Sequence, residues 1–489
     1  MKLYRWIILA LMALYLVLLI PGSAPTVPPL TEKRPFAWNQ DEYWSSLQNQ
    51  FKEALQVGCP RLNSRIDSAF AKIATLTDSL NIKSYEPDDP IFAIIETTIF
   101  ELGTEIGVCR DRLPQYMESF NQIRSAIKTQ STHWDMNSEA SRIRLYRFLY
   151  GGRAAIEQVM LQLPSDSVPA LSVCEDVPSA TPSTTILGVT IHSGDILVSR
   201  GGAPTSALIA RGNDFQGNFS HVALVYVDSA SGKASIIESH IEQGIAIATL
   251  DDYLRDTKLR VMVLRLRPDL LGLKSVPMLP GNAAAYMLER ARSRHIPYDF
   301  QMDFADSNKL FCSEVASQAY RHVGLTLWMG MSHISSPGIR NWLGSFGVTH
   351  FETQEPSDLE YDPQLKVVAE WRDPKTLARD QIDNAIIDVM LEFAEMGVTF
   401  KYSMYLLPVA RTLKAYSVVL NWFGGIGPVP EGMDATAALR NKWFSAQHAQ
   451  IKELMLPQIE KFKAENGYAP PYWELVKLAR QAKITAENR

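Results

Sequence analysis

One cysteine of the chain, Cys312, has neighbours that suit a catalytic nucleophile. It lies in the segment Phe311-Cys312-Ser313-Glu314-Val315, shortly after the polar cluster Asp306-Ser307-Asn308, which predicts the start of a helix. The first turn of a helix stabilises a thiolate through its unpaired N–H groups and its dipole. A thiolate is the reactive form of cysteine, and it needs a base to accept its proton. On its own such a cysteine is more often a small buried side chain, so a catalytic role requires a base nearby.

Histidine and glutamate side chains in a predicted β-hairpin supply that base. His221 begins one apolar strand, and Glu238 and His240 lie two residues apart on the second strand, hence on one face. If the turn is symmetric, Val227 pairs with Ala234, His221 lies opposite His240, and Glu238 is the diagonal neighbour within side-chain reach. A polar partner of this kind fixes the tautomer of a catalytic histidine and stabilises its imidazolium form. The hairpin therefore predicts His221 as base and either Glu238 or His240 as its partner.

Five short strings of the sequence, in this order, resemble the YaeF/YiiX-type enzymes, a circularly permuted, NlpC-type group of papain relatives that is also similar to lecithin-retinol acyltransferase. The strings are Gly194-Asp195-Ile196-Leu197, Ser220-His221-Val222-Ala223, Ile237-Glu238-Ser239, Pro297-Tyr298-Asp299-Phe300 and Phe311-Cys312-Ser313-Glu314. In most papain-like enzymes the cysteine precedes the histidine, whereas in the permuted group the histidine comes first, as here. The resemblance covers residues 186–372 and leaves the flanking regions without a match.

The resemblance implies a role for each matched residue. It implies Cys312 as nucleophile, His221 as base and Glu238 as the third catalytic residue. Many NlpC-type relatives have a histidine at the third position, so His240 stays an alternative. Tyr298 matches a tyrosine beside the cysteine, where it would donate a hydrogen bond to the substrate carbonyl or the oxyanion, together with the Cys312 backbone N–H. Packing of the loop explains Tyr298 equally well.

The expected chemistry is acyl transfer through a thioester, and several substrates fit it. His221 takes the thiol proton, the thiolate attacks a carbonyl, and water later resolves the thioester. The first expectation is an amide hydrolase acting on envelope peptides such as peptidoglycan stems. The alternatives are a lipid esterase or acyltransferase with the same thioester, and a catalytically silent envelope scaffold. A zinc site built from His221, His240 and Cys312 is not predicted, because no short ligand spacing supports it, and no cofactor is expected.

The periodicity of the chain predicts an α+β fold with helical regions on both sides of the motifs. A chain of 489 residues is too long for one hydrophobic core. The expected segments, in order, are a signal or membrane anchor (1–24), a proline-rich tether (25–37), a bundle of about four helices (38–164), a linker (165–185), the papain-like domain with a small antiparallel sheet (186–372) and a C-terminal helical region (373–489).

The N-terminus predicts export of the chain. Lys2 and Arg5 come before an apolar run from Trp6 to Ile20, which Pro21-Gly22 ends. Pro25 directly after a cleavage site at Ala24 disfavours processing, so we expect an uncleaved anchor with the body outside the cytoplasmic membrane, and cleaved secretion is the alternative. An oxidising compartment allows a disulfide, and Cys59 and Cys109 fall in helical patterns of one region where they could pair.

The remaining composition limits the partners. The net charge of −5 is spread along the chain, and no basic stripe interleaved with aromatic residues occurs, so nucleic-acid binding is excluded. The stretch from Tyr402 to Phe423 is unusually apolar, and it fits either core packing or contact with a membrane surface or a lipid-like ligand. The sequence does not predict an oligomeric state.

Overall fold

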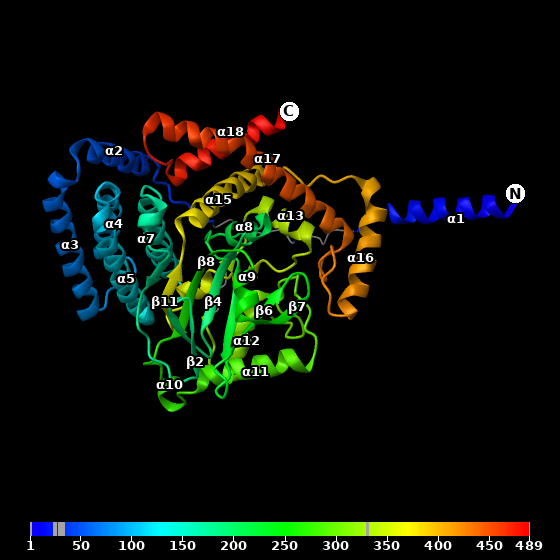
Figure 1. Ribbon diagram of the computed structural model, residues 1–489, viewed down its shortest axis with the longest axis horizontal. Coiled ribbons are helices and arrows are strands. Elements are labelled where there is room, and N and C mark those ends of the chain that lie inside the picture. Colours follow the sequence, from blue (N-terminus) through cyan, green and yellow to red (C-terminus); the bar gives the residue numbers. More distant parts are fainter. Residues whose placement is uncertain (1, 23–26, 28–34, 329–331, 489) are drawn as a thin grey trace.

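The computed structural model describes residues 2–22, 27, 35–328 and 332–488 of the chain. It shows a seven-stranded antiparallel sheet with helices around it (Figure 1), so the predicted α+β class is confirmed. The cleavage site considered at Ala24 and most of the predicted tether lie outside the described residues.

The central sheet has the strand order β1-β11-β8-β4-β5-β6-β7. Its strands are β1 (Leu171–Val173), β4 (Ile196–Gly201), β5 (His221–Val227), β6 (Ala234–His240), β7 (Gly244–Thr249), β8 (Lys258–Leu266) and β11 (Leu365–Trp371). The late strand β11 pairs with β8. Strand β1 belongs to the segment predicted as a linker, and it pairs with β11 at the edge of the sheet.

The β5–β6 hairpin has the predicted register. Val227 pairs with Ala234, and the ladder continues to Ala223 opposite Glu238. The same register places His221 and His240 beside each other at the open end of the hairpin, with ring centroids 5.2 Å apart. Both strands are apolar at most positions, because helices and loops cover both faces of the sheet here.

Alternate residues of β5 point to opposite faces of the sheet. Val222 and Leu224 belong to an apolar cluster with Cys312 and two helices, and Ala223 and Val225 belong to the cluster on the other face. The helices of the first face are α11 (Leu279–Ser293) and α12 (Cys312–His322). The second face is covered by α9 (Leu250–Arg255) and by the hairpin of β2 (Ser183–Ile186) and β3 (Val189–His192).

The N-terminal region is a helical bundle with more helices than the four predicted. They are α2 (Asp41–Val57), α3 (Cys59–Ile82), α4 (Pro90–Ile106), α5 (Leu113–Gln130), α6 (Glu139–Tyr146) and α7 (Gly152–Met160). The predicted apolar stripe lies on α4, where Ile95, Ile99 and Ile106 are buried. A disulfide joins Cys59 to Cys109, which confirms that pairing.

The C-terminal region is also helical and packs against the bundle and the sheet (Figure 1). Its helices are α15 (Pro374–Glu395), α16 (Leu407–Trp422), α17 (Ala435–Asn466) and α18 (Tyr472–Glu487). Helix α15 begins as predicted, with the Asp373 side chain accepting a hydrogen bond from the Lys375 N–H and Pro374 in the first turn. Shorter elements complete the central part: α8 (Pro204–Arg211), α10 (Leu271–Ser275), α13 (Pro337–Phe346), α14 (Asp358–Tyr361), β9 (Ser332–His333) and β10 (Glu352–Thr353).

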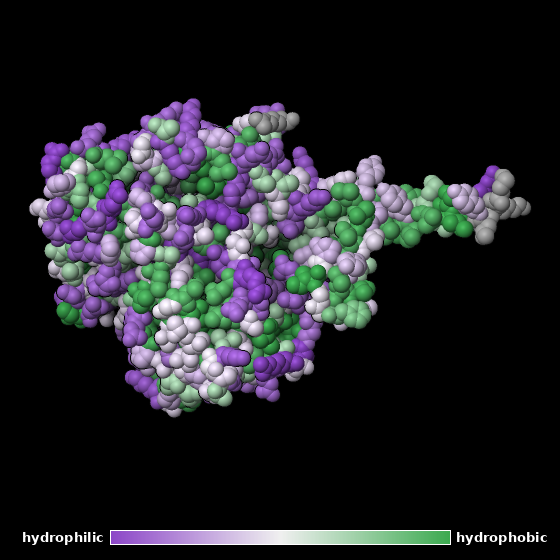
Figure 2. Space-filling model, in the orientation of Figure 1, coloured by the Kyte–Doolittle hydropathy of each residue, from purple (hydrophilic) through white to green (hydrophobic). Residues whose placement is uncertain are grey.

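Helix α1 (Lys2–Leu18) projects from the body beside α16 (Figure 1). Arg411 of α16 donates hydrogen bonds to the carbonyl oxygens of Val17 and Ile20. Apolar side chains cover much of α1 and continue onto the surface of α16 (Figure 2), where Tyr416 and Trp422 are exposed. Over the described residues, no helix has both the length and the apolar character needed to cross a membrane.

Candidate active site

Three side chains at the open end of the β5–β6 hairpin form one hydrogen-bonded group. The Nε2 atom of His221 lies 2.8 Å from Oε2 of Glu238, and the Nε2 atom of His240 lies 3.0 Å from Oε1 of the same carboxylate. Glu238 is buried between the two imidazole rings. The structure therefore brings together His221 and both candidates for its partner, and Glu238 is the residue that contacts the His221 ring through a hydrogen bond.

The surroundings set the charge of each member of this group. Burial lowers the pKa of His221, and the neighbouring Glu238 carboxylate only partly offsets that effect. Burial lowers the pKa of His240 too, but the hydrogen bond and charge of Glu238 outweigh it, so the net shift is upward. Burial alone would raise the pKa of Glu238, yet the two histidines hold it well below its usual range. At neutral pH the group therefore contains an ionised Glu238 and a neutral His221.

The tautomer of His221 follows from that charge distribution. A carboxylate only accepts hydrogen bonds, so Nε2 of His221 carries the proton that it donates to Glu238. The lone pair of a neutral imidazole is then on Nδ1. This is the state that a general base needs, with a free nitrogen and an anion behind the ring.

Cys312 begins helix α12, as predicted, and its thiol points at strand β5. The Sγ atom lies 3.9 Å from the carbonyl oxygen of Ser220, and the backbone N–H of Val222 also contacts it. The sulfur thus lies against the backbone on both sides of His221. Because α12 packs on the face of Val222 and Leu224, the thiol approaches the strand from that face.

The sulfur and the imidazole are neighbours along the strand without a hydrogen bond between them. Within the described part of the chain, no such bond joins Cys312 Sγ to a ring nitrogen of His221. Glu238, which holds the His221 ring, is paired with Ala223, and Ala223 faces away from Cys312. The structure therefore assembles base and partner on one face of the strand, and Cys312 packs with Val222 against the other face.

The resting thiol is protonated. Burial raises the pKa of Cys312 to about 12, and the charge of Glu355 adds to this effect, although contacts with Ser313 and Val222 oppose it. The expectation that the helix N-terminus would favour the thiolate is therefore not met in this arrangement, because Cys312 is only 4% exposed and the cost of burying a charge is larger than the stabilisation by the helix. Proton removal needs a base that approaches the sulfur.

A cavity of about 60 Å³ adjoins the sulfur, and Tyr298 forms part of its wall. Burial raises the pKa of Tyr298 well above its usual value, and the charge of the neighbouring Cys312 adds to this effect. The phenol is therefore a hydrogen-bond donor at neutral pH. This placement agrees with a role beside the nucleophile, while the edge-to-face contact of Tyr298 with Phe300, with centroids 5.0 Å apart, shows that it also packs the loop.

The sequence does not single out Glu355, a carboxyl group in the same cavity wall. It is 5% exposed, and burial, with the charge of Asp358, raises its pKa to about 8. Glu355 precedes α14 and matches none of the motif strings, so only the folded chain brings it to Cys312. A protonated Glu355 is an O–H donor that does not oppose a negative charge on the sulfur.

The start of α12 differs from the expected one in its cap. The Glu314 carboxylate accepts a hydrogen bond of 3.0 Å from the Phe311 N–H, one turn upstream. Asp306 instead accepts from the backbone N–H of Asn308 and closes a local turn. The polar cluster 306–308 was thus a turn signal, and the helix begins where the first-turn glutamate reaches back.

The His221, Glu238 and His240 group also has the composition of a metal site. One ligand atom from each residue lies within 4.8 Å of the others. Cys312, the third ligand of the zinc site considered from the sequence, is not in this group. The two hydrogen bonds to Glu238 account for the arrangement without an ion, and they use the atoms that a metal would bind.

Comparison with known families agrees with the resemblance seen in the motifs. The sequence model of a permuted papain-like amidase family, YaeF/YiiX, C92 family, matches residues 190–369. No curated protein matches the chain. The matched segment contains β4 to β8, α11, α12 and most of β11, and it includes His221, Glu238, Tyr298 and Cys312. Residues 190–369 of this chain are therefore similar to the permuted papain-like amidase family of the YaeF/YiiX type.

Proposed function

We propose that this chain is a cysteine-dependent amidase that cleaves an amide bond of cell-envelope peptides through a thioester on Cys312. The family match supports amide hydrolysis in general. The observation that carries the residue assignment is the neutral His221, held at Nε2 by Glu238, on the strand whose backbone contacts the Cys312 sulfur. A base with a free Nδ1 then lies on the strand that contacts the sulfur of a first-turn cysteine.

The proposed reaction begins with a movement that brings the His221 ring to the Cys312 sulfur, since no hydrogen bond joins them in the resting arrangement. Nδ1 of His221 accepts the thiol proton, and Glu238 stabilises the resulting imidazolium. The thiolate forms a bond to the substrate carbonyl carbon, the C–N bond breaks, and His221 returns the proton to the leaving amine. Water, deprotonated by His221, then hydrolyses the thioester and restores the thiol. Catalytic hydrogen bonds that are long without substrate commonly shorten in the complex, which fits the resting geometry.

Donors around the cavity would stabilise the charge that develops on the carbonyl oxygen. Cys312 is the first residue of α12, so its backbone N–H lies at the helix N-terminus. Tyr298 and the protonated Glu355 line the same cavity and carry O–H groups. Donors of this kind act most strongly in a site that excludes water. The small size of the cavity means that a substrate must approach with a narrow acyl group.

We also propose that the protein works outside the cytoplasmic membrane, next to a lipid surface. The apolar α1 and the adjoining α16 expose a continuous group of large apolar side chains, among them Trp6, Tyr416 and Trp422 (Figure 2). Exposed aromatic residues of this kind favour the interface between lipid and water. The Cys59–Cys109 disulfide agrees with an oxidising compartment.

The same surface favours a second candidate, a lipid esterase or acyltransferase that uses the same thioester. A direct test offers the full chain two substrates, soluble peptidoglycan stem peptides and phospholipid vesicles, and measures new amino groups and released fatty acid. We expect new amino groups with the native chain and none with Cys312→Ala. Cys174→Ala is the matched control, because Cys174 is the other free cysteine among the described residues.

The outcomes separate the candidates. Fatty acid release that Cys312→Ala abolishes, without new amino groups, would replace the amidase by the lipid enzyme. Activity that persists in Cys312→Ala would exclude Cys312 as the nucleophile. A chain that shows neither activity, and whose Cys312 no thiol-directed probe labels, would instead be the silent scaffold.

A further inference from the structure

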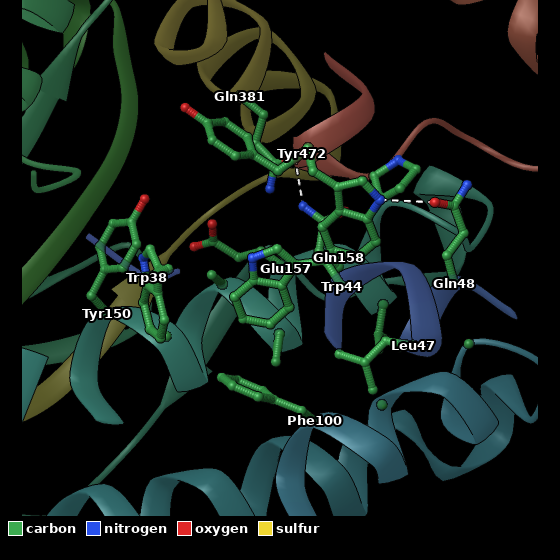
Figure 3. A pocket seen from close by; sticks show the side chains of 18 of the residues that line it. Trp38, Trp44, Leu47, Gln48, Phe100, Tyr150, Glu157, Gln158, Gln381 and Tyr472 are labelled. Atoms are coloured by element: carbon green, nitrogen blue, oxygen red, sulfur yellow. Dashed lines mark hydrogen bonds between the residues drawn. The ribbon is translucent and has the colours of Figure 1, made fainter. Parts of the chain in front are cut away.

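A second and larger cavity lies where the helical bundle, the papain-like domain and the C-terminal helices meet (Figure 3). Its volume is about 300 Å³, which reaches the range of small-molecule sites. Helices α2, α4, α7, α15 and α18 contribute to its walls, together with the segment between α8 and β5. It shares no lining residue with the cavity beside Cys312.

One wall of this cavity is aromatic. The rings of Trp44 and Trp473 stack with centroids 5.9 Å apart and an angle of 9° between their planes. Trp38 meets Trp44 edge to face at 5.6 Å, and Phe100 and Tyr150 continue the surface (Figure 3). Rings that pack on one another in this way form a stiff apolar wall, suited to a flat or extended apolar group.

The other end of the cavity is polar, and its charged groups already have partners. Glu157 accepts hydrogen bonds of 2.6 and 3.1 Å from Arg260. Asp388 accepts bonds of 2.8 and 2.7 Å from Arg211 and one of 2.7 Å from Tyr472. Each carboxylate is thus compensated by an arginine. A ligand with a net charge would have to be desolvated without a free counter-charge, so the site favours a neutral ligand.

Two amide oxygens at this end lack partners. Asn384 is 2% exposed, and its Oδ1 atom has no hydrogen-bond partner among the described residues. The same is true of Oε1 of Gln158, whose Nε2 donates to Gln381 over 2.9 Å (Figure 3). Buried polar atoms are normally paired, and an unpaired oxygen beside a cavity calls for a donor. The cavity therefore offers two unpaired acceptors.

We propose that this cavity binds a neutral amide with an apolar tail, with the N–H groups on the unpaired oxygens of Asn384 and Gln158 and the tail along the tryptophan wall. The proposal does not depend on the chemistry of Cys312. It assigns a separate binding site to the junction of the three regions.

Tryptophan fluorescence of the full chain tests the proposal with a terminally brominated undecanamide, because bromine quenches indoles that it touches. Trp38, Trp44 and Trp473 are three of the chain's 10 tryptophans, so quenching should saturate with most of the emission left. We expect saturable quenching by the amide and weaker binding of the brominated undecanoate, which has no N–H donor and carries a charge.

Two variants make the test specific. Ala154→Phe fills the cavity from α7 and should abolish saturable quenching. Asn384→Leu removes an unpaired acceptor and should weaken amide binding about fivefold while leaving the undecanoate unchanged. Asn466→Leu makes the same chemical change at an exposed position near the end of α17, and it should change neither.

The results that overturn the proposal are equally distinct. Quenching that never saturates, or that Ala154→Phe leaves intact, means that the probe binds elsewhere. Equal affinity for amide and carboxylate, with no effect of Asn384→Leu, means that the unpaired oxygens do not recognise a donor.

Discussion

At the residue scale, Glu238 is the centre of the candidate site because both histidines donate to it. Its carboxylate contacts His221 and His240 through different oxygens, so the two sequence-based candidates for the third residue have different positions in one network. His221 is held directly by Glu238, while His240 stacks beside it at 5.2 Å and shares the carboxylate. The geometry thus assigns the primary orienting role to Glu238 and a supporting role to His240.

This division predicts unequal effects of two substitutions. Glu238→Gln removes the charge that stabilises the imidazolium and offers one oxygen to two donors, so we expect kcat to fall about a hundredfold or more. His240→Gln keeps Glu238 and His221 in contact, so we expect a loss of about tenfold, with KM little changed in both variants. Steady-state kinetics on an amide or activated ester measure both. A larger loss in His240→Gln would make His240 the orienting residue.

The protonated resting thiol predicts a pH dependence of alkylation. Because burial raises the pKa of Cys312 to about 12, the reactive thiolate is scarce at neutral pH and becomes more abundant throughout the alkaline range. We therefore expect iodoacetamide to label Cys312 slowly at about pH 7 and steadily faster above about pH 9. A Cys174→Ala background isolates the signal, since Cys59 and Cys109 form a disulfide. A rate that is already maximal at about pH 6 would show a resting thiolate–imidazolium pair instead.

At the element scale, a close approach between two backbone segments positions the Tyr298 loop. Gly244, at the start of β7, has a φ of +73°, and a Cβ there would lie 2.2 Å from the Ile296 carbonyl oxygen and 2.9 Å from Pro297 Cα. The Ile245 N–H also donates to that carbonyl over 2.9 Å. The turn after His240 therefore holds the chain that leads into Tyr298.

Gly244→Ala should damage the site through this contact. The added methyl group must push Ile296 and Pro297 away, which moves Tyr298, so we expect lower kcat together with a clear fall in Tm. Gly232→Ala is the control, because Gly232 also has a positive φ, of +68°, but a Cβ there meets no atom within 4 Å. Its cost should be only the backbone strain of about 1–2 kcal/mol, with activity intact. Equal activity losses in both variants would contradict the positional argument.

Sequence patterns predicted the local elements of the site well, and failed where long-range packing decides. The alternation of residue types and the symmetry of the turn were enough to predict the β5–β6 register. A slip of one residue would move every side chain of a strand to the opposite face of the sheet. The start of α12 was also predicted, but its cap was not, because the polar cluster 306–308 and Glu314 competed for that role.

The features that the sequence missed arise from contacts between distant segments. Strand β1 pairs with β11, 200 residues away at Leu171 and Trp371, and no local pattern marks such a pairing. Glu355 likewise lines the Cys312 cavity although it lies far from Cys312 in the sequence. The separation of thiol and imidazole also could not be predicted, because it depends on which face of the sheet α12 packs against.

At the scale of the whole molecule, one buried arginine connects the three regions. Arg260 of β8 donates to Glu157 of bundle helix α7 and, over 2.8 Å, to Asp380 of C-terminal helix α15. All three side chains are buried. Removing one partner of a buried ion pair leaves uncompensated charge in the interior, which costs more than the pair itself contributes.

We therefore expect Arg260→Met to be strongly destabilising. It removes the arginine that Glu157 and Asp380 share and leaves each with one more distant cation, Arg372 at 3.6 Å and Arg200 at 3.2 Å. The loss should be about 3–5 kcal/mol, seen as a lower midpoint in urea unfolding. Arg255→Met is the matched control, because Arg255 forms an exposed pair with Asp252 at 3.1 Å, and its loss should cost less than about 1 kcal/mol. Similar midpoints for the two variants would show that the three regions do not depend on this junction.

The central claim is that Cys312 carries the acyl group during turnover, and intact-protein mass spectrometry tests it most directly. The full chain is mixed with an aryl ester of a short acyl group, quenched in acid and weighed, then digested to locate the added mass. We expect one acyl group on Cys312, removed by hydroxylamine as a thioester is, absent in Cys312→Ala and formed much more slowly in His221→Gln. An acyl group on another residue, or one that persists in Cys312→Ala, would contradict it.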